Sequence, residues 1–429
     1  MRFALWLAGL FAVAVAVALF AGSNPGTVTL FWPPYRVDLS LNLVLLILVG
    51  IFVTLHLALR ALSAMFGIPQ QARRWRVQQK ERAMQATLLD ALSHLMGGRF
   101  IRARKSAELV VSLEEAVARS GEPLAYAHRL RALAHLLAAE SAHSLQDRAV
   151  RDAHLEEALA EVAVKDAQDV REAVLLRAAR WAFDDRDPAR TAQWLDQLPQ
   201  GASRRTVALR LRFKAARLAG QALQALDLSR LLTKHRAFSE VAGLSIARGL
   251  ALEHLQSAHD PTQLQRAWSE LDPQERALPD VAMLAAERLL DLGGEAELSR
   301  QWLMPVWDQM LAQADALQLS QRIRLARLLD AGFAASETAP DTRWLARVEA
   351  AQQANPRDAV LQYLAGVVCM RMELWGKAQL LLRQCLGLLK DAGLRRDAWR
   401  ALALVAEQRD DQAAATEAYR QALQPAGKP

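Results

Sequence analysis

The chain has 429 residues, of which 52% are hydrophobic and 23% charged, and its formal net charge is +7. This composition excludes a mainly disordered protein, and two cysteines exclude a disulfide-stabilised scaffold and a zinc site built from several cysteines. The charge is concentrated, because residues 60–105 carry a net +8 whereas residues 106–429 sum to −2. The body of the chain therefore has no broad basic face, and we predict no nucleic-acid binding.

Two apolar segments near the N-terminus are predicted to span a membrane. As helices, residues 3–21 would be about 28 Å long and residues 39–59 about 31 Å, close to a hydrocarbon core of about 30 Å. Small residues around Ala21 also fit the cleavage site of a signal peptide, but a second span so close by favours a retained pair. We therefore expect residues 1–60 to form a two-helix transmembrane hairpin with residues 22–38 as its outer loop.

A basic collar follows the second apolar segment. Because basic residues collect on the cytoplasmic side of membrane spans, the collar predicts a multi-pass protein with both termini in the cytoplasm. The same side chains would attract anionic lipid. Residues 61–105 are expected to form a juxtamembrane helix that leads into the first helical pair. The collar consists of Arg60, Arg73, Arg74, Arg76, Lys80 and Arg82.

From about residue 70 onward, apolar residues recur three and four positions apart, which predicts one helix after another. A turn at Gly97-Gly98 is expected to separate the first pair. Pro305 lies inside such a segment and is expected to kink or split its helix. Four pairs of a capping residue and a proline predict helix starts. These pairs are Asp187-Pro188, Asp260-Pro261, Asp272-Pro273 and Asn355-Pro356.

The last helices have the spacing of the tetratricopeptide repeat, in which small residues let two antiparallel helices approach closely. The clearest repeats are residues 356–389 and 395–425. Their repeat positions hold Gly366, Cys369, Ala378, Leu382 and Cys385 in the first and Trp399, Ala403, Ala415, Tyr419 and Ala422 in the second. The two cysteines are expected to be buried, reduced thiols. Residues 106–429 are thus predicted to form a degenerate tetratricopeptide superhelix, and the fold class to be all-α.

A superhelix of this kind has a concave inner face that binds partner proteins. By analogy with the repeat, we predict which side chains of the last two repeats line that face. They are Val360, Tyr363, Val367, Arg371, Asp397, Arg400, Leu404 and Gln408.

Motifs that carry chemistry are not found in the sequence. It has no glycine-rich phosphate loop, nucleophile elbow, zincin motif or EF-hand loop. His128, His135 and His143 are seven and eight residues apart, and seven residues is about 10.5 Å along a helix, too far for two of them to hold one metal ion. We predict no catalytic residue, no metal site and no bound cofactor, and no motif supports contact with heme or porphyrin.

Three features together are similar to one known family. They are the segment Asn24-Pro25-Gly26-Thr27-Val28-Thr29-Leu30-Phe31-Trp32-Pro33-Pro34-Tyr35 that joins two spans, the basic Arg73-Arg74-Trp75 with Lys80, and the C-terminal repeats. This layout resembles the proteobacterial HemY family of heme biosynthesis. The resemblance implies a bacterial inner-membrane location with a periplasmic loop at residues 22–38. It also implies a non-catalytic scaffold in late protoheme synthesis, near ferrochelatase and related enzymes. The FAD-dependent protoporphyrinogen oxidases that share the name need a glycine-rich dinucleotide fold, which this sequence lacks.

Two alternative hypotheses remain open at this point. One is a tetratricopeptide scaffold for envelope or lipopolysaccharide assembly. Such proteins often have one span and a C-terminal metal site, whereas this chain has two apolar segments and no clustered cysteines. The other is a carrier that binds heme or porphyrin directly.

Overall fold

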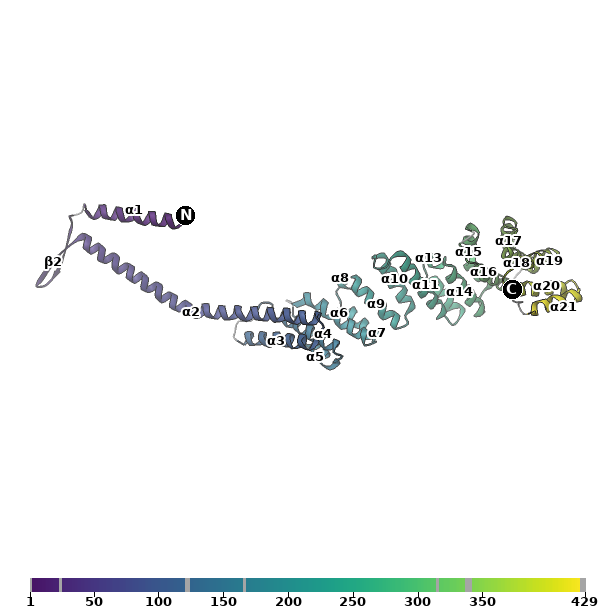
Figure 1. Cartoon of the computed structure of the whole chain (residues 1–429), viewed down its shortest axis with the longest axis horizontal. Coiled ribbons are helices and arrows are strands. Elements are labelled where there is room, and N and C mark those ends of the chain that lie inside the picture. The colour runs from purple at the N-terminus through teal and green to yellow at the C-terminus, as the bar shows by residue number, and fades with distance from the viewer. Residues whose placement is uncertain are drawn as a thin grey trace. The chain divides into compact units, whose positions relative to one another are not determined.

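The computed structural model describes residues 2–22, 25–119, 124–164, 167–313, 316–335 and 342–424. Helices make up almost all of these residues, and two short strands are the exception (Figure 1). The fold is therefore all-α, as the sequence predicts. The chain divides into two compact units, Met1–Val170 and Arg171–Pro429. The predicted boundary at residue 105 lies inside a helix of the first unit.

The first unit begins with helix α1 (Arg2–Gly22), strands β1 (Thr27–Trp32) and β2 (Tyr35–Ser40), and helix α2 (Leu41–Met96). The strands are antiparallel, pair Thr27 with Ser40 and Trp32 with Tyr35, and turn at Pro33-Pro34. The sequence analysis predicts only a loop here. The hairpin forms because β-branched and aromatic residues fill β1, which suits an extended strand.

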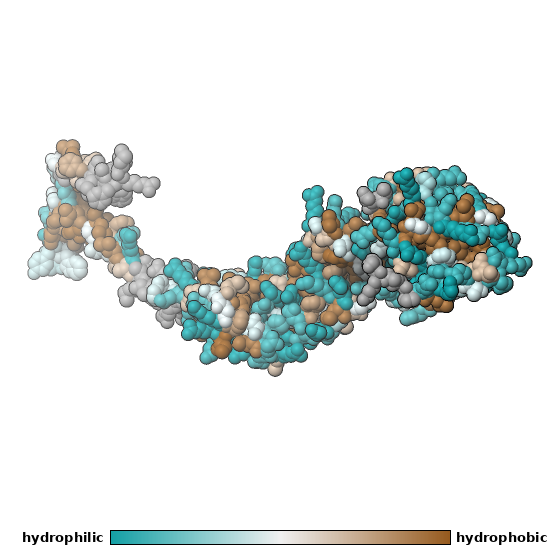
Figure 2. Space-filling model, turned by 45° about the vertical axis from the view of Figure 1, so that its right-hand side comes forward, coloured by the Kyte–Doolittle hydropathy of each residue, from teal (hydrophilic) through white to brown (hydrophobic). Residues whose placement is uncertain are grey.

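Helix α2 carries the second predicted span. Leu41–Leu62 is long and apolar enough to cross a membrane, with exposed side chains, and Figure 2 shows hydrophobic residues along this part of the chain. Ser40 caps the helix, since its hydroxyl accepts a hydrogen bond from the Leu43 N–H at 3.4 Å. The helix then continues for 56 residues, which is about 84 Å at 1.5 Å per residue. The span and the predicted juxtamembrane helix are therefore one helix.

The basic collar lies along α2. The side chains of Arg60, Lys80 and Arg82 are exposed. The collar residues Arg73, Arg74 and Arg76 lie in the helical backbone of α2, but their side chains fall outside the described ones.

Three further helices complete the first unit: α3 (Phe100–Ala118), α4 (Ala127–Ser144) and α5 (Arg148–Glu161). Each packs against the helix before it. Helices α2 and α3 meet at the predicted Gly97-Gly98 turn, where Gly98 has φ +71°, a left-handed conformation that favours glycine. Ala91, Ala103 and Ala107 are fully buried between these helices. Their small side chains let α2 and α3 approach each other closely.

The second unit is a stack of paired helices. Helix α6 (Gln168–Asp184) crosses the boundary between the units. The helices that follow are α7 (Pro188–Asp196), α8 (Gln200–Ser203), α9 (Thr206–Leu218), α10 (Ala222–Lys234), α11 (Glu240–Gln256), α12 (Pro261–Ser269), α13 (Pro273–Arg276), α14 (Pro279–Asp291), α15 (Ala296–Ala312), α16 (Leu319–Ala334), α17 (Thr342–Ala354), α18 (Ala359–Arg371), α19 (Trp375–Leu386), α20 (Ala392–Glu407) and α21 (Gln412–Leu423). One hydrophobic core runs through the unit from Leu209 to Ala418.

The pairing follows the tetratricopeptide pattern. Helices α9 and α10, α14 and α15, α18 and α19, and α20 and α21 pack as successive pairs. Helices α11, α14, α16, α18 and α20 also contact one another in that order, and we call them the A helices. The unit is therefore a degenerate tetratricopeptide-type solenoid.

Local capping signals explain most helix starts. Asp187 and Asp260 accept hydrogen bonds from the backbone N–H groups of Arg190 and Gln263, each at 2.8 Å. Asp272 forms a capping box with Glu275. These three predicted starts are confirmed.

The predicted start at Asn355-Pro356 is wrong. Helix α18 begins at Ala359, and its cap is Asp358, whose Oδ1 accepts from the N–H groups of Val360 at 3.0 Å and Leu361 at 3.2 Å. Asp358 also pairs with Arg322 of α16, so a contact from another helix favours it over Asn355.

Pro305 does not split its helix, because α15 runs through it without a break, and the kink that the sequence equally allowed stays a prediction. Pro305 is exposed, as is Gln301 four residues earlier. The Gln301 carbonyl, which loses its helical hydrogen bond to the proline, therefore lies on the side that water reaches.

Most repeat positions of α18 to α21 are packed as predicted, but Tyr419, a repeat position of the last pair, is 37% exposed. Cys369, Ala378, Leu382, Cys385 and Ala403 are fully buried. A Cβ atom added to Gly366 would lie 2.7 Å from Cγ of Leu382, so α18 and α19 touch where only glycine fits. Burial raises the pKa of the Cys369 thiol to about 11 and that of Cys385 to about 12, which keeps both thiols protonated.

The cap at Asp358 makes a first prediction. Asp358→Ala should lower the free energy of unfolding by about 1–2 kcal/mol, because it removes an N-cap and a half-buried ion pair. Asn355→Ala, the control at the position that sequence alone favours, should change it by less than about 0.5 kcal/mol. Chemical denaturation of the full chain in detergent, followed by circular dichroism, measures both. Equal effects would contradict the assignment of the cap.

The close contact at Gly366 makes a second prediction. Gly366→Ala should destabilise the chain by about 1–3 kcal/mol, because the added methyl group overlaps Leu382. Gly376→Ala in the neighbouring α19 is the matched control, since nothing lies within 4 Å of its added Cβ. It should be neutral or stabilising by up to about 1 kcal/mol. Thermal unfolding should show a lower melting temperature for Gly366→Ala and an unchanged or higher one for Gly376→Ala. An unchanged melting temperature for Gly366→Ala would contradict the prediction.

Candidate functional site

The predicted inner-face residues do not all reach the surface. Val360, Tyr363 and Val367 of α18 are 4%, 1% and 0% exposed. Helix α18 is surrounded, because it packs against α16, α17, α19 and α20. These three residues belong to the core, and their prediction as partner-binding residues is wrong.

The other predicted residues lie nearer the surface. Arg400 and Leu404 of α20 are exposed, and so is Gln408 just after α20. Arg371 and Asp397 are partly exposed but already have partners. Arg371 lies 3.6 Å from the Asp330 carboxylate, and Asp397 lies 2.8 Å from Nε of Arg327.

These contacts form a polar network that joins α16, α18 and α20. Arg327 of α16 pairs with Asp397 of α20, while the Tyr363 hydroxyl of α18 donates a hydrogen bond to Oδ2 of Asp330 at 3.0 Å. Burial raises the pKa of Asp330, against the opposing effects of Tyr363 and Arg371. Burial and the nearby Asp330 carboxylate also raise the pKa of Tyr363. The network therefore fixes three A helices to one another, and its role is structural.

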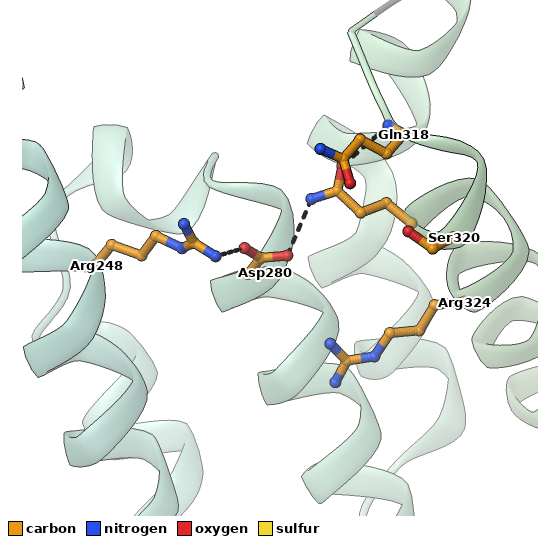
Figure 3. Close-up of a pocket in the computed structure, with 6 residues that line it drawn as sticks. Arg248, Asp280, Gln318, Ser320 and Arg324 are labelled. Atoms are coloured by element: carbon orange, nitrogen blue, oxygen red, sulfur yellow. Dashed lines mark hydrogen bonds and ion pairs between the residues drawn. The ribbon is translucent and has the colours of Figure 1, made fainter.

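A pocket of about 420 Å³ opens between α11, α14 and α16. All its lining side chains are polar. They are Arg248 from α11, Asp280 from α14, and Gln318, Ser320, Gln321 and Arg324 at the start of α16. Figure 3 shows Arg248 and Asp280 pointing toward each other, with Arg324 extending into the space between helices.

Asp280 is the centre of this pocket. Its Oδ1 accepts a hydrogen bond from Nε2 of Gln321 at 3.0 Å, and its Oδ2 pairs with Arg248. Asp280 lies in the first turn of α14, where the helix dipole favours a carboxylate. The carboxylate therefore links three A helices.

The capping box of α16 fixes the positions of two further polar side chains of the pocket, Gln318 and Gln321. Oε1 of Gln321 accepts from the backbone N–H of Gln318 at 3.1 Å, which holds both amides at the pocket. Arg324, one turn later, pairs with Glu287 of α14. The pocket can hold polar or charged groups, but its one carboxylate already has two partners, so the arrangement does not offer a free general base.

Residues 26–146 match a family model described as HemY protein N-terminus. This N-terminal region is therefore similar to the N-terminus of HemY proteins. The matched residues cover the β-hairpin, helices α2 and α3, and helix α4. No curated protein matches the chain.

Several solved structures resemble the chain at low similarity. Yeast Tom70 is 15% identical, with 78% of this chain and 67% of that chain covered and a TM-score of 0.29. The Cut9–Hcn1 hetero-tetramer of the APC/C is 14% identical, with 79% and 65% covered and a TM-score of 0.28. The TPR domain of P58(IPK) is 14% identical, with 76% and 99% covered and a TM-score of 0.21. The solenoid assignment therefore rests on the helix pairing in the chain itself.

The histidines inside the HemY-matched region have partners. Nδ1 of His128 lies 2.7 Å from the Glu161 carboxylate, and Nδ1 of His143 lies 3.2 Å from Arg151. His135 lies 3.1 Å from His154 of the next helix, a contact that the sequence did not indicate, and burial together with His154 lowers the pKa of His135. Within the described ranges, no group of three or more His, Cys, Asp or Glu side chains is placed to hold a metal ion.

The polar network gives a third prediction. Tyr363→Phe removes the hydroxyl that donates to Asp330 and should cost about 1–3 kcal/mol of stability at neutral pH. Because the folded-state pKa of Asp330 is raised, this carboxyl becomes protonated as the pH falls through that pKa, and the loss should then shrink. Chemical denaturation of wild type and variant at neutral and mildly acidic pH measures this loss of stability.

Tyr419→Phe is the control for this prediction. Tyr419 lies at the surface of α21, so the substitution should change stability by less than about 0.5 kcal/mol at either pH. A Tyr363→Phe variant as stable as wild type at neutral pH would show that the hydrogen bond does not support the network.

Proposed function

We propose that this chain belongs to the HemY family and is a non-catalytic scaffold of the bacterial inner membrane. It recruits enzymes of late protoheme and porphyrin synthesis, ferrochelatase among them, to the cytoplasmic face by protein–protein contacts. The observation that carries this proposal is the match of residues 26–146 to the HemY N-terminus, because it joins an apolar helix and a helical repeat in one family.

Membrane attachment is supported by the N-terminal helices. Leu41–Leu62 is apolar and exposed, and α1 is a second apolar helix of 21 residues without an acidic side chain. Our proposal is that both helices span the bilayer, with the β-hairpin between them in the periplasm and both termini in the cytoplasm. The exposed Arg60, Lys80 and Arg82 support that orientation and would favour anionic lipid by about 1 kcal/mol for each side chain near the surface.

The chemistry of the described side chains favours binding over catalysis. Burial keeps the two thiols protonated, which makes them poor nucleophiles. The carboxylates on the A helices are paired with arginines across helices, as in Arg248–Asp280 and Arg324–Glu287. Such pairs leave guanidinium and amide groups at a surface, which suits recognition of another protein.

A membrane-anchored scaffold would act by raising local concentration. Two proteins held by short tethers meet at effective concentrations in the mM range, without any gain in the affinity of either contact. For a pathway whose intermediates are reactive porphyrins, this would shorten the path between consecutive enzymes.

The fourth prediction tests this recruitment. The full-length chain, crosslinked in native membranes and purified, should retrieve at least one enzyme of late tetrapyrrole synthesis. Deletion of the gene should raise the cellular level of a porphyrin precursor, and the wild-type chain should restore it. Mass spectrometry and porphyrin fluorescence provide the two measurements.

A chain with Leu41–Leu62 replaced by an unrelated transmembrane helix is the control for this experiment. It should retrieve the same enzymes, because recruitment is assigned to the helical repeat. Recovery of lipopolysaccharide-assembly proteins instead, with unchanged porphyrins, would contradict the heme role and favour the envelope alternative.

A further inference from the structure

We infer that the pocket between α11, α14 and α16 is a docking site for an acidic segment of a partner protein. This inference rests on the proposed scaffold function and adds the chemistry of the segment that is bound. Its basis is the set of hydrogen-bond donors that converge on the pocket.

The two arginines supply most of the donors. The side chains of Arg248 and Arg324 are 51% and 39% exposed, and they pair with the carboxylates of Asp280 and Glu287 respectively. A guanidinium has five N–H groups arranged as a planar fork that fits a carboxylate. Each arginine therefore keeps donors for an incoming carboxylate.

The single carboxylate of the lining does not oppose an anionic ligand strongly. Asp280 is held by Arg248 on one oxygen and by Gln321 on the other, at 3.0 Å. The six lining residues carry a net charge of +1, and Glu287, which pairs with Arg324 from outside the lining, offsets it. The preference for an acidic side chain over a basic one therefore comes from the remaining guanidinium N–H donors and not from net charge.

The start of α16 adds to this preference. Ser320 lies in the first turn of this 16-residue helix and lines the pocket with an exposed hydroxyl-bearing side chain. The N-terminus of a helix carries a partial positive charge that attracts anions. Here the helix N-terminus lies beside two arginines, so all three groups attract an anion.

The size and polarity of the pocket indicate a peptide as the occupant. Sites for small molecules and cofactors are mostly apolar with a few polar groups. This pocket of about 420 Å³ is lined by polar side chains throughout. It can admit one or two acidic side chains of an extended segment, while the rest of the segment would lie along the neighbouring A helices.

The fifth prediction uses a defined probe, a fluorescently labelled hexaglutamate peptide, with the full chain in detergent. Fluorescence anisotropy should show binding that weakens with added salt. Hexaglutamine and hexalysine peptides should bind at least about tenfold more weakly, because neither offers a carboxylate to the arginines.

Three variants locate the binding. Arg248→Ala and Arg324→Ala should each weaken hexaglutamate binding about tenfold, as expected for loss of a charge-assisted hydrogen bond. Ser320→Glu should weaken it by at least as much, because it places a carboxylate in the pocket while leaving both arginines intact. An acidic residue in the first turn of α16 favours the helix, so this variant should fold normally.

Two matched controls accompany these variants. Arg383→Ala removes an exposed arginine from α19, outside the pocket, and Gln412→Glu adds an acidic residue to the first turn of α21. Both should bind hexaglutamate as wild type does. Circular dichroism of every variant confirms that the fold is retained.

The outcomes separate this inference from the proposed function. If hexaglutamate does not bind, or binds all variants equally, the acidic-segment site is wrong, whichever enzymes crosslinking retrieves. If it binds at the pocket but no tetrapyrrole enzyme is retrieved, the site stands and the heme role fails. Equal binding of hexaglutamine would show that charge does not drive recognition and would also overturn the inference.

Discussion

Helices of this chain approach one another at alanine and glycine, and the rest of the structure depends on that close approach. In the first unit, Ala91, Ala103 and Ala107 are completely buried between α2 and α3. In the second, Gly366 leaves room for Leu382 and no more. Short separations between helices increase van der Waals contact and exclude water, so a composition rich in small and aliphatic residues can support a long stack.

Charged pairs between helices act in addition to this packing. They connect A helices of different repeats, as Arg248–Asp280, Arg322–Asp358 and Arg327–Asp397 do. Such half-exposed pairs add little stability each, but they set how neighbouring repeats are oriented and leave a polar surface on the A helices. The surface that we propose for binding is therefore also the surface that joins the repeats.

Local features of the sequence predicted much of the fold. Caps such as Asp187 and Asp260 act within one turn, and the small residues at repeat positions act within one helical pair, so both can be found from spacing alone. Asn355 was chosen wrongly because the competing Asp358 gains a partner, Arg322, from a helix far earlier in the chain. Tyr363 was placed on the binding face because the analogy fixed its helix face but not the packing of α16 and α20 over that face. The pocket was missed for the same reason, since its residues come from three helices spread over residues 248–324.

The two cysteines have a consequence for the chemistry around the protein. They occupy positions where the repeat requires a small side chain, and burial leaves them as neutral thiols that solvent does not reach. Oxidants attack thiolates that are accessible, so sulfenic acid formation is disfavoured at both positions. In the function that we propose, beside photosensitising tetrapyrroles, these two positions of the repeat would thus keep their thiols unaltered during oxidative stress.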